Sequence, residues 1–219
     1  MFADLAQMAA YIQDNQDRFL ELLSEHVQLT VLSVVLGLLI ALPLAVVASR
    51  VEVLAKPLTW MAAIGQTIPS IAILGLMLPF LGTGFVPSLF ALTIRAVLPI
   101  FLNGYVGIRS TDPAIVDAAR GMGMSEAQLL LLVQLPLASP VLFAGIQTAT
   151  VQNIGLATLA AFIGGGGLGD LILQGLAMLD ASVLLAGAVP VALLAMVAEL
   201  GLGRLQRLVV PAGLQGAPR

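Results

Sequence analysis

Long apolar segments alternate with short polar stretches along this chain. Each apolar segment reaches the roughly 20 residues that a helix needs to cross the hydrocarbon core of a bilayer. Lipid offers no partner for open backbone groups, so such segments are expected to be helical. Alternating segments of about 10 residues, typical of a membrane β-barrel, are not seen. The pattern predicts an all-α membrane protein with five spans, at residues 27–48, 58–80, 86–108, 137–163 and 183–205.

The composition supports a membrane location and excludes several other classes of protein. Of the 219 residues, 59% are hydrophobic and 10% are charged, whereas an ordinary soluble domain carries about 25% charged residues. The net charge of −3 gives no basic surface for a nucleic-acid partner. The chain has no Cys and one His, so thiolate and His-cluster metal sites are not expected. We expect a single transmembrane domain over residues 1–219, without a metal site.

The positions of the basic residues predict the orientation of the spans. Five spans place the loops after spans one and three, together with the C-terminus, on one side of the membrane. Cytoplasmic loops carry an excess of Lys and Arg. Seven of the nine basic residues fall on this side: Arg50, Lys56, Arg109, Arg120, Arg204, Arg207 and Arg219. The N-terminus is therefore expected outside the membrane and the C-terminus in the cytoplasm.

Residues 1–26 precede the first span and are predicted to form an extracytoplasmic tail. The stretch RFLELLSE, residues 18–25, has the pattern of a short helix lying in the membrane interface. In that arrangement Phe19, Leu22 and Leu23 face lipid. The alternative is a frayed polar tail, and the sequence leaves both open.

The run GGGGLG at residues 164–169 contains the G-x-G-x-x-G spacing of a dinucleotide site. That fingerprint is meaningful only between a strand and a helix of a βαβ unit, and here the glycines follow the fourth span. A break in the chain at the outer membrane face fits better, because Gly adopts unusual backbone angles. Residues 168–178 are then expected to form a short helix or a re-entrant piece, with Asp170 near its positive end.

The loop at residues 111–136 carries two helix-start signals in succession. Asp112 followed by Pro113 is an N-cap with proline at the first helical position. Ser125 and Gln128 have the spacing of a capping box, and the glycines of 121–123 stop the first helix. We predict a helix, a turn and a second helix before span four. Small residues and Met on the first helix suit docking in the groove of a partner.

This loop resembles a motif found in the transmembrane subunits of ABC importers, E-A-A-x-x-x-G-x9-I-x-L-P. All spacings match, with Asp in place of Glu and Val in place of Ile. The matching residues are Asp117, Ala118, Ala119, Gly123, Val133, Leu135 and Pro136. The resemblance implies a type I ABC importer permease fold, in which this loop is the coupling helix that rests on the ATPase subunit.

Further stretches resemble the osmoprotectant permeases that import glycine betaine, carnitine and choline. They lie at residues 66–82, 98–108 and 155–172. The resemblance implies a multi-pass protein of a bacterial-type inner membrane. It also implies a second permease subunit, identical or paralogous, a dimer of ATPase subunits and a separate extracytoplasmic substrate-binding protein. ATP binding would close the ATPases, move the coupling helices and rock the spans from inward-open to outward-open.

Energy for transport is expected to come from another chain. No G-x-x-x-x-G-K-[ST] motif occurs, and the sole Lys is Lys56. We therefore expect no cofactor in this chain, with ATP and Mg²⁺ on the partner ATPase. No nucleophile and base pair suggests covalent chemistry, so the chain is expected to be a permease and not an enzyme.

Polar residues inside apolar spans are candidates for the translocation path, because they tend to face a cavity or the bundle interior. Those expected here are Gln66, Thr67, Ser70, Arg95, Asn103, Gln147, Gln152 and Asn153, with Thr150 as a further polar residue. Hydrogen bonding between helices is the alternative for each of them. Pro69 and Pro79 are expected to kink or end span two.

Arg95 is the most unusual of these residues because it lies near the middle of span three. A wet cavity, the interface with a second permease or a structural partner would each accommodate it. The one clearly intramembrane acid, Glu199, lies nearer the cytoplasmic end.

Other functions remain open at this stage. The nearest alternative is an ABC permease for another small solute, such as methionine or another amino acid. A channel or secondary transporter that works without an ATPase leaves the 111–136 loop unexplained. A membrane scaffold without transport leaves the intramembrane polar residues unexplained.

Overall fold

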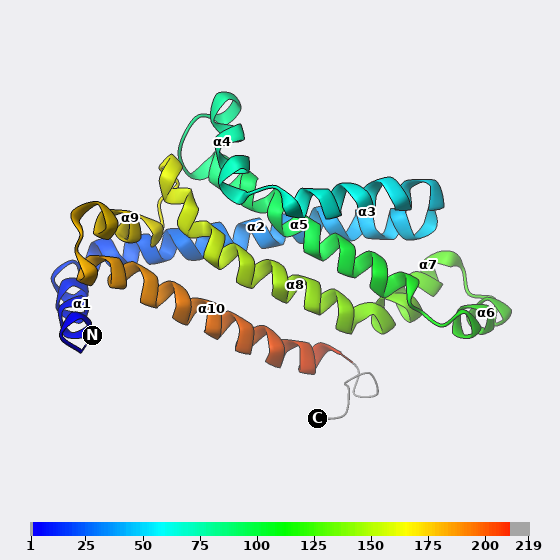
Figure 1. The fold of residues 1–219 in the computed structure, drawn as a ribbon. Coiled ribbons are helices and arrows are strands. Elements are labelled where there is room, and N and C mark those ends of the chain that lie inside the picture. Colours follow the sequence, from blue (N-terminus) through cyan, green and yellow to red (C-terminus); the bar gives the residue numbers. More distant parts are fainter. Residues whose placement is uncertain (1, 211–219) are drawn as a thin grey trace.

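The computed structural model describes residues 2–210, and these form helices and no strands. The helices lie side by side in an elongated bundle, with α1 and α9 at one end and α6 and α7 at the other (Figure 1). Their bounds are α1 Phe2–Asp14, α2 Gln16–Arg50, α3 Glu52–Thr67, α4 Ser70–Leu81, α5 Phe85–Arg109, α6 Pro113–Gly121, α7 Glu126–Gln128, α8 Leu135–Ala157, α9 Gly169–Met178 and α10 Ala181–Val209. A π-helical segment, Leu129–Gln134, precedes α8, and a 3-10 segment, Thr158–Ile163, follows it.

Among the described residues, four helical segments are long and apolar enough to cross a membrane, and the bent pair α3 and α4 gives a fifth when counted as one span. The four segments are Gln16–Arg50, Phe85–Arg109, Glu126–Ile163 and Ala181–Val209. This all-helical arrangement confirms the fold class expected from the apolar pattern.

The second span, predicted over residues 58–80, is broken at Pro69, where a kink or an end was expected. It breaks after Thr67, and α3 and α4 meet at an angle of 100°. Ile68 and Pro69 take extended backbone angles between the two helices. Proline lacks the N–H that would continue the helix, which explains the break at Pro69. Pro79, in contrast, lies inside α4 and does not end it.

The expected N-terminal tail is also helical and belongs to the bundle. Residues 18–25 are the first turns of α2 and not a frayed tail, and they continue directly into the long apolar helix. Leu22 is only 1% exposed. It packs with Leu168 and Val183 in a small core against which Tyr11 of α1 is also packed. Lipid therefore does not cover Leu22, because helices distant in sequence do.

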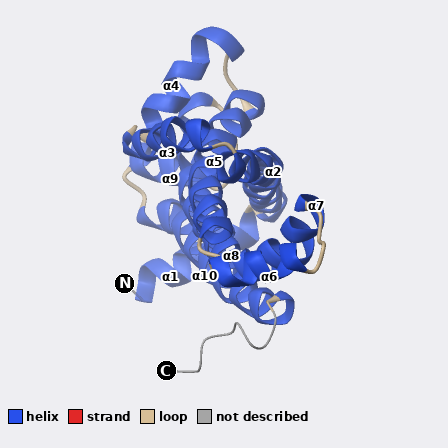
Figure 2. Cartoon of the chain, turned by 90° about the vertical axis from the view of Figure 1, so that its right-hand side faces the viewer, coloured by secondary structure: helices blue, strands red, loops and turns tan. Residues whose placement is uncertain are grey.

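Small residues let α5 approach its neighbours closely. The helix packs against α2 and against α8 (Figure 2). A Cβ added to Gly37 of α2 would lie 2.7 Å from the Cβ of Ala96. One added to Gly145 of α8 would lie 2.7 Å from the Cβ of Asn103. Because lipid competes well for large apolar side chains, close contact through small residues is a main source of helix association in membranes.

The glycine run at residues 164–169 forms a tight turn at the α1 and α9 end of the bundle. Gly164, Gly166 and Gly167 have φ of 71°, 76° and 83°, values that favour glycine. The Gly167 N–H donates to the Glu25 carboxylate over 2.9 Å. A Cβ on Gly165 would lie 2.1 Å from the Ser88 hydroxyl oxygen. These contacts confirm that the run is a structural break, and α9 follows it as the expected short helix.

Asp170 lies in the first turn of α9, as expected for a carboxylate near a helix N-terminus. Burial raises the pKa of its carboxyl group, and the nearby Arg18 guanidinium opposes that rise. The two side chains form an ion pair of 3.3 Å. Both side chains are partly exposed to solvent, so this ion pair between α9 and α2 contributes little to the free energy of folding.

Candidate functional site

The loop between α5 and α8 begins with a short helix whose ends are set by local chemistry. The Asp112 carboxylate accepts a hydrogen bond of 2.8 Å from the Ala114 N–H, and Pro113 takes the first turn of α6. Gly123 follows the helix with φ of 83°, a conformation that glycine adopts without strain. The expected helix start and stop are both confirmed.

The second helix-start signal is confirmed, but the helix that it begins does not stop before the fourth span. Ser125 and Gln128 form a reciprocal capping box, with hydrogen bonds of 3.3 and 2.8 Å. From Glu126 the helical backbone continues through the π segment and α8 to Ile163. Pro136 therefore lies inside a continuous helical segment and does not mark a separate entry to the span. Val133, Leu135 and Pro136 are half-buried where the loop joins α8.

The two alanines of the motif face opposite ways. Ala119 is 2% exposed and anchors α6 against the bundle, whereas Ala118 is exposed. Ile115 and Met122 are 44% and 73% exposed, and their spacing from Ala118 places the three side chains on one face of the helix. Asp117 is exposed as well. The loop thus presents a small apolar face at the tip of the bundle.

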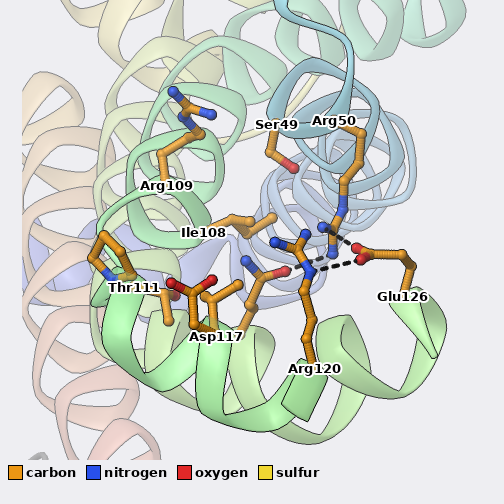
Figure 3. Close-up of a pocket in the computed structure, with 11 residues that line it drawn as sticks. Ser49, Arg50, Ile108, Arg109, Thr111, Asp117, Arg120 and Glu126 are labelled. Carbon is orange, nitrogen blue, oxygen red and sulfur yellow. Dashed lines mark hydrogen bonds and ion pairs between the residues drawn. The ribbon is translucent and has the colours of Figure 1, made fainter. Parts of the chain in front are cut away.

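One carboxylate links the loop to the first span. Glu126 accepts a hydrogen bond of 2.8 Å from Arg50, at the end of α2, and one of 3.0 Å from Arg120, at the end of α6 (Figure 3). Arg50 also donates to the Gln134 side chain. The bond to Glu126 raises the pKa of the Arg120 guanidinium. This cluster helps to position α6 relative to the spans.

The same groups line a pocket of about 520 Å³ between α2, α5 and α6 (Figure 3). Arg109, Thr111 and Asp117 form its other side. Its lining is largely polar and charged, which suits an aqueous surface at the membrane boundary. No group of three or more His, Cys, Asp or Glu side chains able to hold a metal ion occurs among the residues that the structure describes.

Two of the candidate path residues, the buried Asn153 and the half-buried Asn103, form hydrogen bonds within the bundle. Asn153 is 1% exposed, and its amide donates to the Ser33 hydroxyl over 2.8 Å and to the Leu92 carbonyl over 3.0 Å. It joins α8 to α2 and α5 and does not line an exposed surface. Asn103 donates to the Pro99 carbonyl one turn earlier in α5. The contacts of Asn153 fit the alternative of hydrogen bonding between helices, whereas the Asn103 bond stays within α5.

Other candidates lie on the surface of the single chain. Gln66, Thr67 and Gln152 are exposed, and Ser70 and Gln147 are half-buried. Thr150 is half-buried and donates to the Ile146 carbonyl of its own helix. Gln147 and Gln152 line a shallow pocket of about 400 Å³ between α8 and Glu199 of α10.

Sequence reasoning missed Thr148, which is exposed in the same pocket. Its spacing of four residues from Gln152 was the available signal, because such residues share a helix face. Ala144 extends this face by another turn. The resulting stripe is small and polar, unlike a lipid-facing surface.

Arg95 has partners in its own chain. Its side chain is half-buried and donates to backbone carbonyls at the end of α3, the shortest contact being 3.3 Å to Gly65. The sequence left open a wet cavity, an interface with a second permease or a structural partner for Arg95. The structure shows a structural partner, the end of α3.

The contacts of Asn153 lead to a stability prediction. Replacing Asn153 with alanine removes two hydrogen bonds between helices and should lower the free energy of unfolding by about 1 kcal/mol. Gln152→Ala, at the exposed neighbouring position, should leave it unchanged. Denaturation of both variants by SDS in mixed micelles, followed by circular dichroism, makes the comparison. Equal stabilities would show that the buried amide contributes nothing to the fold.

Comparison with known proteins places this geometry in a family. Residues 33–212 match the family described as "Binding-protein-dependent transport system inner membrane component". The choline transport system permease protein OpuBB of Bacillus subtilis (strain 168) is 44% identical over 94% of this chain and 94% of its own length. The glycine betaine/carnitine/choline permease OpuCB of the same organism is 42% identical over 96% and 97%. The osmoprotectant import permease OsmW of Salmonella typhimurium is 40% identical over 94% and 98%.

Solved structures show the same fold. A chain of the MetNI methionine ABC transporter in an inward-facing conformation aligns with a TM-score of 0.83 and 22% identity, covering 90% of this chain and 99% of that one. An amino acid ABC transporter aligns with a TM-score of 0.71 and 19% identity, covering 91% and 95%. The fold, the inner-membrane family match and the end-to-end likeness to three permeases agree. The chain belongs to the family of inner-membrane components of binding-protein-dependent transport systems.

Proposed function

We propose that this chain is the permease subunit of an ATP-driven importer for an osmoprotectant of the quaternary-amine class, such as choline, glycine betaine or carnitine. The observation that carries the proposal is the end-to-end likeness to permeases named for these solutes. The fold alone is shared with methionine and amino acid transporters at much lower identity, so it does not select the solute.

The exposed face of α6 is the surface on which we place the ATPase subunit. Ile115, Ala118 and Met122 form an apolar face that lipid does not need to cover, because it lies beyond the end of the spans. Such a face suits a hydrophobic groove in a partner. ATP and Mg²⁺ would be held by that partner, and movement of α6 would reach the spans through Glu126 and the continuous helix that begins there.

The charges at the two ends support the proposed orientation. Arg50, Arg109 and Arg120 lie together beside α6 (Figure 3), and Lys56 lies near the start of α3, just after the end of α2. This end of the bundle therefore suits the cytoplasm. The opposite end carries acidic side chains, including Asp14, Asp17 and Glu21. We place the substrate-binding protein at that end.

The translocation path is assigned to exposed and half-buried polar positions of α3 and α8. Polar side chains within apolar helices require water or protein around them, and the described part of this chain does not cover them. A second permease subunit facing Gln66, Thr67, Gln147, Thr148 and Gln152 would enclose them around a wet path. Passage of a small solute along such a path needs no covalent step.

Reconstitution into proteoliposomes tests the proposed function. The chain is combined with the ATPase and the binding protein encoded beside it, and ATP hydrolysis and solute uptake are measured with choline, glycine betaine, carnitine and methionine. We expect hydrolysis and uptake to rise with at least one quaternary amine and not with methionine.

Three outcomes distinguish the parts of the proposal. Stimulation by methionine alone would retain the importer and reject the solute class. Uptake without any ATPase would instead favour a channel or secondary transporter. Uptake of a quaternary amine that depends on all three components would support the full proposal.

A further inference from the structure

A single arginine in the middle of α5 supplies the hydrogen-bond donors at the break in the second span. Nη1 of Arg95 lies 3.3 Å from the carbonyl oxygen of Gly65, 3.4 Å from that of Gln66 and 3.4 Å from that of Ile68. Two of these carbonyls belong to the last turn of α3, and the third belongs to the residue after it. The guanidinium therefore joins the third span to the end of the broken second span.

These carbonyls need a donor because the break has removed their ordinary partners. In a continuous helix the Gly65 carbonyl would accept from residue 69, but that residue is proline and has no N–H. The last carbonyls of any helix lack partners within it. The Thr67 hydroxyl serves the Ile64 carbonyl over 2.7 Å. Arg95 donates to the carbonyls on either side of Thr67, those of Gln66 and Ile68.

The inner side of the break is apolar, so Arg95 is the charged group that reaches the carbonyls from α5. The inside of the bend is a pocket of about 360 Å³, and all the residues that line it are apolar, among them Ile68, Ile73, Ile94 and Leu98. A cation at the end of α3 also complements the negative end of the helix dipole. Conversely, an arginine at this depth is costly unless it has such partners. The Arg95 guanidinium therefore supplies donors to the carbonyls freed by the break, and these carbonyls supply the partners that the half-buried charge needs.

We propose that Arg95 is a positioning residue that sets the bend between α3 and α4, and that transport requires this bend. The first part rests on the contacts alone, and the second rests on the proposed function. Gln66 and Thr67, which we assign to the path, occupy the same turn as the carbonyls held by Arg95. A change in the bend would therefore move side chains of the path while leaving the α6 end of the bundle in place.

The bend can be measured directly because the chain contains no Cys. Nitroxide labels on Trp60→Cys in α3 and Phe80→Cys in α4, both exposed positions, report the distance across the break by pulsed electron paramagnetic resonance. We expect one narrow distance distribution in the labelled parent. Arg95→Met should broaden or shift it, because an interhelical hydrogen bond in a membrane favours the packed arrangement by up to about tenfold. If transport requires the bend, transport should fall by a similar factor.

Two variants separate positioning from a general loss of charge. Arg95→Lys keeps a cation with hydrogen-bond donors and should retain the distribution and most of the transport. Arg204→Met removes a cation from α10, far from the break, and should leave the distribution unchanged. An unchanged distribution together with full transport in Arg95→Met would overturn the proposal.

A further variant keeps the test decisive when Arg95→Met does not fold. Adding Pro69→Ala restores the missing N–H donor and lets the second span continue as a helix. The double variant should then recover folding with a longer distance between the labels. Failure of this rescue would contradict the assigned role. Because the distance is measured without solute, a wrong solute assignment would leave the result on the bend intact.

Discussion

Replacing Gly145 with valine is expected to prevent this permease from folding in the membrane. A Cβ at this position lies 2.7 Å from the Cβ of Asn103 and 3.0 Å from the Pro99 carbonyl oxygen. The Asn103 Cβ is fixed to the backbone and cannot turn aside, so α8 and α5 must separate. Overpacking of a close contact costs about 1–3 kcal/mol and occasionally more, and α5 is the helix against which both α2 and α8 pack.

The measurement is the yield of monodisperse protein after detergent extraction, followed by SDS denaturation of any folded fraction. Gly155→Val is the matched control, because Gly155 lies in the same helix and no atom is within 4 Å of its added Cβ. Gly145→Ala should be destabilised less than the valine variant. Equal yield and stability for Gly145→Val and Gly155→Val would show that the close helix contact is not needed.

Replacing Ala118 with tryptophan is expected to abolish coupling to the ATPase while leaving the fold intact. Ala118 is exposed at the tip of the bundle, beside Ile115 and Met122. Because Ala118 is exposed, a large side chain there should not clash with the described part of this chain. It would, however, keep a docked partner from contacting the face formed with Ile115 and Met122. Changing a residue at the centre of a protein interface can lower the binding free energy by about 2 kcal/mol or more. Binding-protein-stimulated hydrolysis should therefore fall by about 30-fold or more.

Copurification of the ATPase with the permease measures this effect apart from transport. Ala177→Trp is the control, because Ala177 is exposed in α9 at the opposite end of the bundle, and it should retain the ATPase. Ala119→Trp makes a contrast, since Ala119 is buried and its replacement should disturb the loop itself. Normal copurification of the ATPase and normal hydrolysis with Ala118→Trp would contradict the assignment of this face as the docking surface.

The structure of the loop at residues 111–136 could be predicted closely because it is local. The cap at Asp112, the turn at Gly123 and the capping box at Ser125 depend on residues within a few positions of one another. Each signal acts through hydrogen bonds that form in any chain carrying those residues. The orientation of the two motif alanines was harder to predict, because only the packed bundle shows which one is covered.

For a related reason, the sequence alone could not show which candidate path residues are buried and which are exposed. A polar residue in an apolar span signals only that lipid cannot surround it. The same signal fits Asn153, which bonds to neighbouring helices in the core, and Gln152, which is exposed beside it. Their adjacency in sequence places them on different helix faces, and the positions of α2 and α5 decide which face is buried.

The sequence by itself determined that this is a multi-span α-helical membrane protein with a capped helix-turn-helix loop. Those features follow from length, hydrophobicity and short-range hydrogen bonding. Only the tertiary structure decided that residues 18–25 continue into the first span and that Arg95 serves the broken second span. Leu22 is buried by residues about 150 positions away, and Arg95 lies 27 to 30 positions from its carbonyl partners. Contacts between distant residues depend on how the helices pack, and no local pattern records that packing.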